Sequence, residues 1–156
     1  HLQVGMGRRF RALKIYLVLL HLGAEYIREA LRKQVRLAAL FAELIASDKD
    51  FELFVPQHLG LVCFRISNST NKENAALCNA IVKDRRVYLL PAKVGGELFI
   101  RLVICSALTT EDDIRFTFNL CKEILANTKT TSVILETQEV QEDIKNDQQQ
   151  ILSSES

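Results

Sequence analysis

The hydrophobic period of this chain changes near residue 50, and that change limits the folds that the sequence can adopt. Before it, apolar residues recur at spacings of three and four, as on one side of a helix; they are Ile27, Leu31, Val35, Ala38, Phe41 and Ile45. After it, short runs of β-forming residues are bounded by turn signals and alternate with further helical patterns. The pattern therefore predicts a helical start followed by a mixed α and β region.

The predicted order of elements is helix, helix, strand, strand, helix, strand, strand, helix. Helices are expected at about 9–22, 27–45 and 73–83 and after a cap at Thr109 or Thr110, and strands at 51–55, 59–66, 87–90 and 97–106. Because proline cannot donate to a sheet ladder, Pro56 and Pro91 are expected to end the first and third strands. Gly23 is expected to end or bend the helical start, and Gly95-Gly96 to join antiparallel strands. Together these features predict an α+β fold, with helices on one face of a mostly antiparallel four-stranded sheet.

The composition indicates which kinds of binding partner and cellular compartment to expect. The chain has 156 residues, of which 48% are hydrophobic and 25% charged, so it can bury one core. A formal net charge of +1 gives no reason to expect nucleic acid or an anionic membrane as a partner. The most apolar run, 15–22, is far shorter than the roughly 20 residues that span a bilayer. With no secretory signal and four cysteines in apolar surroundings, we expect a cytoplasmic protein with reduced thiols.

The two ends of the chain differ from its middle. The sequence begins HLQVGMGRRFRALK with no initiator methionine, which suggests the C-terminal piece of a longer protein. From about Thr128 onward the chain is rich in Thr, Gln, Glu, Asp and Ser. We expect residues 128–156 to be a disordered polar tail.

Arg101 is the residue whose position most suggests chemistry. Alternation along 97–106 places it between Phe99 and Val103 on one side of a strand. A guanidinium among apolar neighbours fits a clamp for a carboxylate or phosphate. It also fits an arginine that extends from a half-exposed sheet to water, and the pattern alone favours this second interpretation.

Three segments resemble one enzyme family. GRRFRALK at 7–14, LGLVCFR at 59–65 and IRLVICS at 100–106 are similar, in this order, to the C-terminal part of pyridoxal-phosphate-dependent aromatic-L-amino-acid decarboxylases. FELFVPQ from Phe51 and VYLLPA from Val87 extend the resemblance, which covers about the first 127 residues. It implies the end of a large domain and a connecting helix over 1–23, and the small C-terminal domain of a fold-type-I enzyme over 24–127.

The resemblance implies a homodimer with its active site between subunits, pyridoxal 5'-phosphate as cofactor and an aromatic amino acid as substrate. The Schiff-base lysine, stacking histidine, ring-nitrogen aspartate and loop tyrosine of the family precede the matching segment, so this chain alone is expected to be inactive. No residue of the chain is assigned to catalysis or cofactor binding.

Three residues match family positions that contact substrate. Met6 and Gly7 match positions that line the ring pocket from the neighbouring subunit, where glycine leaves room for a catechol or indole. Arg101 is similar to the arginine that meets the substrate carboxylate in related glutamate decarboxylases. Leu2 and Gly5 depart from the family pattern HWQIPLGRRF, which leaves the geometry around Met6 open.

Two alternatives to a decarboxylase remain at this stage. Aromatic acetaldehyde synthases share the framework and combine decarboxylation with oxidative deamination, and the Leu22-Gly23-Ala24-Glu25 stretch is at least as similar to them. The other alternative is a catalytically silent fragment that dimerises with a full-length enzyme.

Overall fold

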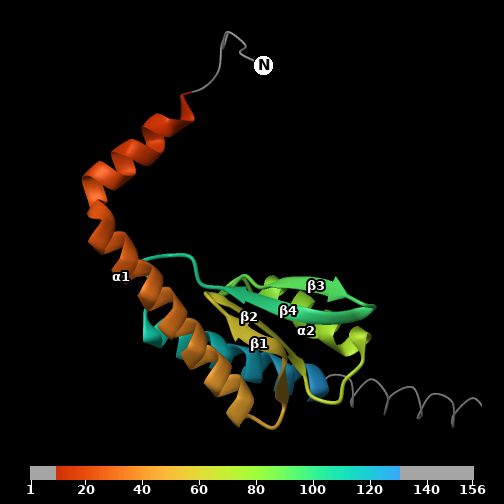
Figure 1. Ribbon diagram of the computed structural model, residues 1–156. Helices are drawn as coiled ribbons and strands as arrows, with labels where there is room; N and C mark the ends of the chain where they lie inside the picture. The colour runs from red at the N-terminus through yellow and green to blue at the C-terminus, as the bar shows by residue number, and fades with distance from the viewer. Residues whose placement is uncertain (1–9, 131–156) are drawn as a thin grey trace, which may run out of the picture.

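The computed structural model describes residues 10–130 of the chain. Figure 1 shows one antiparallel sheet with helices on one of its faces, and a first helix that extends well beyond the sheet. The elements are α1 (Arg11–Ser47), β1 (Phe51–His58), β2 (Leu61–Ile66), α2 (Asn71–Asp84), β3 (Leu90–Val94), β4 (Glu97–Val103) and a last helix over residues 111–130. The predicted α+β class and the order of elements are confirmed.

The two helices predicted at the start are the two halves of α1, which bends at Gly23. This residue has φ +75° and ψ 156°, a conformation that is essentially restricted to glycine. The predicted bend is therefore confirmed, and it falls on the expected boundary between residues 1–23 and 24–127. That division into domains stays a prediction. We call residues 10–22, which precede the bend, the arm.

The sheet has the order β1-β2-β4-β3, so β1 and β3 are its edges. The predicted strand ends at the prolines are wrong, because Pro56 lies inside β1 and Pro91 lies inside β3, which begins at Leu90. An edge strand has ladder bonds on one side only, so it tolerates a residue that lacks a donor. In β1 the register also shifts between Val55 and His58, around Pro56.

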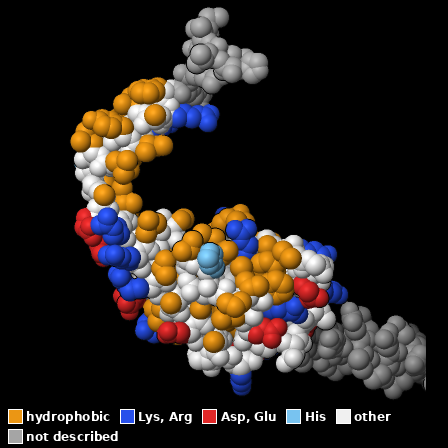
Figure 2. All heavy atoms as spheres, viewed as in Figure 1, with side chains coloured by type: hydrophobic (Ala, Val, Ile, Leu, Met, Phe, Trp, Pro, Cys, Tyr) orange, Lys and Arg blue, Asp and Glu red, His pale blue; other side chains and the backbone are white. Residues whose placement is uncertain are grey.

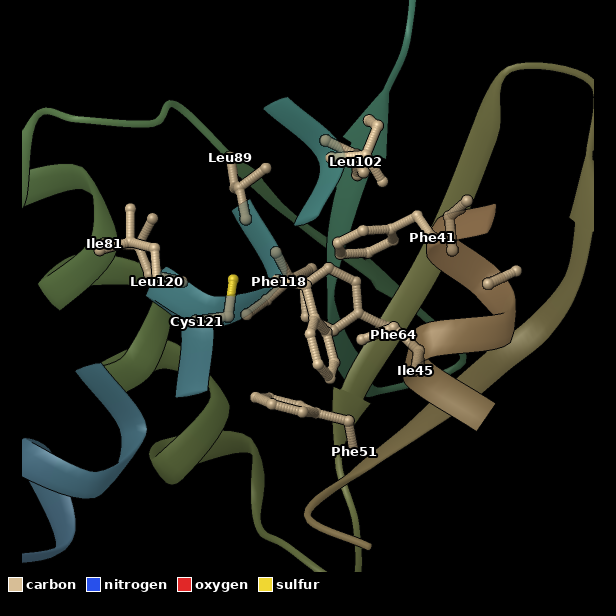
Figure 3. Close-up of a cluster of buried hydrophobic side chains, with 14 of the residues drawn as sticks. Phe41, Ile45, Phe51, Phe64, Ile81, Leu89, Leu102, Phe118, Leu120 and Cys121 are labelled. Carbon is tan, nitrogen blue, oxygen red and sulfur yellow. The ribbon is translucent and has the colours of Figure 1, made fainter. Parts of the chain in front are cut away.

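The core lies between the sheet and the helices (Figure 3), where four phenylalanine side chains form its centre. The Phe41 ring of α1 lies 5.4 Å from that of Phe64 in β2 and 6.5 Å from that of Phe118 in the last helix. Phe51 of β1 lies 5.8 Å from Phe64. These edge-on contacts join α1, the last helix and strands β1 and β2 around one centre.

The last helix begins as predicted and continues further than predicted. Thr110 caps it: the backbone N–H of Asp113 donates to Thr110 Oγ1, and the Thr110 N–H donates to the Asp113 carboxylate. The helix reaches residue 130, past the expected start of the polar tail, and Lys129 forms an ion pair of 2.8 Å with Asp50. The remainder of the predicted tail, 131–156, lies outside the described residues.

Asn74 fixes the turn between β2 and α2. Its side chain is completely buried, and its Oδ1 accepts a hydrogen bond of 2.9 Å from the Ile66 N–H. Its Nδ2 donates to Ser69 Oγ and to the Thr70 carbonyl. One amide thus satisfies polar groups of the strand end, the turn and the helix cap.

We predict that Asn74→Ala lowers the free energy of unfolding by about 2–3 kcal/mol, because it leaves buried polar groups of the turn without partners. Urea unfolding of the chain measures the change. Asn79→Ala, at an exposed position of the same helix, is the matched control and should change stability by less than about 0.5 kcal/mol. Equal effects of the two substitutions would contradict this role for Asn74.

Candidate functional site

The face of the sheet that points away from the core, which we call the outer face, carries the predicted site residue. On β4 the alternation is as predicted: Ile100 and Leu102 belong to the core, whereas Arg101 is exposed on the opposite side. Phe99 is buried outside the core cluster, because its ring stacks on that of Phe54 at 4.2 Å and 12°. The stacked pair forms an apolar floor for one half of the outer face.

Arg101 is surrounded by uncharged side chains. Across the sheet it lies opposite Cys63 of β2 and Leu90 of β3. Along β4 its neighbours on the same side are Phe99 and Val103. Among residues 10–130 no group forms a hydrogen bond or ion pair with its side chain. Its guanidinium is therefore free to bind a ligand. The same exposure is also expected of an arginine that only extends into water.

The thiol beside Arg101 is neutral at neutral pH. Burial raises the pKa of Cys63, and the opposing effect of the Arg101 charge is smaller. A thiolate would neutralise the arginine, so the protonated state of Cys63 preserves the positive charge at the centre of the outer face.

A second arginine on the same face has the opposite surroundings. Arg65 Nη1 lies 2.7 Å from Glu97 Oε2, its Nε lies 3.3 Å from Glu52 Oε1, and its Nη2 donates to the Ser69 carbonyl. The side chain is only 15% exposed. Arg65 was not predicted as a site residue, although the alternation of Leu61, Cys63 and Arg65 along the second strand places it on the same side of the sheet as Arg101.

Large apolar side chains lie exposed on the outer face and on the arm (Figure 2). On the outer face these are Val55, Leu90, Val94 and Val103. On the arm they are Phe10, Leu13, Ile15, Tyr16, Leu17, Val18, Leu19, Leu20 and Leu22. Apolar residues on nearly every side are typical of a buried helix, yet residues 10–22 are all exposed within the described part of the chain. Apolar patches of this extent are typical of surfaces that contact another protein, a membrane or a ligand.

Two of the three predicted substrate contacts, Met6 and Gly7, lie outside the described residues. The structure therefore places only Arg101, and it does not bring the three together. A hollow of about 330 Å³ between α2 and the last helix, lined by Ile66, Lys72, Glu73, Leu77, Leu125 and Lys129 among others, is on the core side of the sheet and does not adjoin Arg101.

No group of three or more His, Cys, Asp or Glu side chains in this part of the chain is arranged to hold a metal ion. The ammonium groups of Lys33, Lys122 and Lys129 bind a backbone carbonyl or carboxylates of the domain itself. None of the described helices is long and apolar enough to cross a membrane.

Comparisons with known proteins agree on one family. The model of the pyridoxal-dependent decarboxylase conserved domain matches residues 1–67. An aromatic-L-amino-acid decarboxylase of Manduca sexta is 42% identical over 125 residues, which cover 80% of this chain and 24% of that protein. A 3,4-dihydroxyphenylacetaldehyde synthase of Drosophila melanogaster is 40% identical over 116 residues, covering 74% of this chain and 22% of that protein.

A solved structure extends the similarity to three dimensions. The crystal structure of Oryza sativa TDC with PLP and tryptamine superimposes with a TM-score of 0.73 at 32% identity, covering 81% of this chain and 29% of that chain. The chain thus spans about a quarter of the length of the curated relatives that it matches.

We predict that the thiols react in an order set by burial. At neutral pH a disulfide reagent should modify the exposed Cys105 and leave Cys63, Cys78 and Cys121 until the chain unfolds, because burial raises the pKa of all three. Mass spectrometry of the labelled peptides measures the order, with Cys105→Ser as the control. If Cys63 reacts as fast as Cys105, Arg101 does not face a neutral thiol.

Proposed function

Because the chain belongs to the pyridoxal-dependent decarboxylase family, we propose that it forms part of an enzyme that decarboxylates an aromatic L-amino acid to its amine. In this reaction the bond from the α-carbon to the carboxyl group breaks, carbon dioxide leaves, and a proton takes its place. Pyridoxal 5'-phosphate, the cofactor of this family, supplies the electron sink. The observation on this chain that best supports the proposal is the unpaired Arg101 on an apolar, exposed sheet face.

The contribution of this chain is to bind and orient substrate. In this proposal the groups that hold and activate the cofactor belong to the rest of the longer enzyme. The exposed arm and outer face support that arrangement, because both offer apolar surface to further protein. We propose that the enzyme is a cytoplasmic homodimer whose active site lies between its subunits.

Arg101 is the proposed partner of the substrate carboxylate. A guanidinium binds a carboxylate through two parallel hydrogen bonds, which a lysine does not reproduce. The neighbours of Arg101 are uncharged, so no carboxylate of the described residues is in contact with its guanidinium. A substrate carboxylate therefore has no other anion to displace.

We predict that Arg101→Ala in the full-length enzyme lowers kcat/KM for the amino acid by about 10- to 100-fold, the effect of losing a charge-assisted hydrogen bond. Affinity for the cofactor should stay unchanged, and Arg101→Lys should recover only part of the loss. Arg115→Ala, which removes an exposed arginine from the last helix, is the matched control. A lower melting temperature with normal kinetics would assign Arg101 a structural role instead.

We propose that Met6 and Gly7 line the pocket for the substrate ring. Gly7→Ser should lower the preference for catechol and indole substrates over smaller rings by about tenfold, because an added side chain removes space from the pocket. Competition assays with pairs of amino acids measure the preference, with Gly5→Ser as the control. Unchanged selectivity would exclude Gly7 from the pocket.

A second function is favoured by one comparison: the 40% identical Drosophila relative is an aldehyde synthase. In that case the amino acid, oxygen and water yield an aldehyde, carbon dioxide, ammonia and hydrogen peroxide. Release of ammonia and peroxide by the full-length enzyme would replace the decarboxylase proposal with this one.

A third possibility is a catalytically silent fragment that dimerises with the full-length enzyme. An initiator codon directly before His1 in the transcript would favour it.

A further inference from the structure

A bulge in β1 adds an aromatic side chain to the row of residues that contains Arg101. The register of β1 shifts between Leu53 and Val55, so Phe54 is an extra residue in that strand. Val55 pairs with Cys63 of β2, and Cys63 pairs with Arg101 of β4. The bulge and Arg101 therefore lie on one row across the outer face, with Cys63 between them.

The ring of Phe54 extends from the bulge to the strand of Arg101. It stacks on the ring of Phe99, with centroids 4.2 Å apart and an interplanar angle of 12°. Because β2 lies between β1 and β4, this stack spans the middle of the outer face. Phe99 and Arg101 are two residues apart on the same side of β4, a separation of about 7 Å along a strand. The stack is thus the aromatic neighbour of the open guanidinium.

The two rings of the stack differ in exposure. Phe99 is 5% exposed, whereas Phe54 is only half-buried. Phe54 is therefore the member of the pair that a ligand can reach, and Phe99 supports it from the sheet. Offset stacking favours one orientation of the two rings, so Phe54 presents a preformed apolar surface beside Arg101.

We propose that Phe54 is a specificity-determining residue that packs against the ring of an aromatic substrate whose carboxylate is bound to Arg101. The inference rests on the proposed role of Arg101. In an aromatic amino acid only the α-carbon and one methylene separate the carboxylate from the ring, so a ring can reach a side chain about 7 Å along the strand. Ring-on-ring packing favours an aromatic over an aliphatic side chain, and it adds a contact to those proposed for Met6 and Gly7.

The test measures competition by phenylalanine and by leucine against the substrate of the full-length enzyme. Phe54→Leu removes the ring and keeps an apolar side chain. It should weaken inhibition by phenylalanine about three- to tenfold, the value of one aromatic pair, and change inhibition by leucine less than about twofold. Phe116→Leu, which removes an exposed aromatic ring from the last helix, is the matched control and should change neither.

A merely structural Phe54 gives a different result. Its replacement would lower the melting temperature and affect both competitors equally, and an equal or absent effect in Phe54→Leu overturns the proposal. If this variant does not fold, Phe54→Trp keeps an aromatic ring on Phe99 and narrows the space beside it. Inhibition by tryptophan should then weaken about threefold relative to inhibition by phenylalanine. An unchanged ratio in this variant also overturns the proposal.

Failure of this inference is distinguishable from failure of the proposed clamp. If Arg101→Ala leaves kcat/KM unchanged, the clamp itself fails. If Arg101→Ala lowers kcat/KM while Phe54→Leu leaves the ratio of the two competitors unchanged, the clamp stands and only the role of Phe54 fails.

Discussion

The contact of Phe41 with Phe64 and Phe118 determines how the described domain is assembled. Phe41 lies on the half of α1 that follows Gly23, Phe64 on a central strand and Phe118 on the last helix. Because these rings meet edge to face, the three elements fix one another's positions, and Phe51 extends the same cluster to the edge strand β1. α1 and the last helix are thereby held on one face of the sheet, and α2 joins the same core through Leu77 and Ile81.

With one face used for the core, the other remains for contact with ligands and further protein. The Phe54–Phe99 stack, the ion pairs of Arg65 and the open guanidinium of Arg101 all depend on strands whose reverse side is anchored by the phenylalanine cluster. The position of Arg101 is therefore set by core residues that no ligand touches. The same holds for the arm, whose direction follows from the backbone of Gly23 alone.

The sequence predicted the fold where hydrophobic periodicity decides the structure. The alternation along β4, the bend at Gly23 and the cap at Thr110 all follow from local rules that the structure obeys. The strand ends at Pro56 and Pro91 were wrong, because whether proline ends a strand depends on its place in the sheet, which only pairing reveals. For the same reason the ion pairs of Arg65, which join residues on three strands, could not be predicted, and Met6 and Gly7 remain predictions.

The two prolines of the chain have one more consequence. Each lies in an edge strand, so each open border of the sheet has a gap in its row of outward hydrogen-bond donors. These gaps oppose the addition of a continuous strand from a neighbouring molecule at either edge. They thereby oppose edge-to-edge aggregation even while the apolar outer face is exposed. Another molecule therefore binds through side-chain packing, and the fit of side chains, not backbone hydrogen bonding, decides which molecule binds.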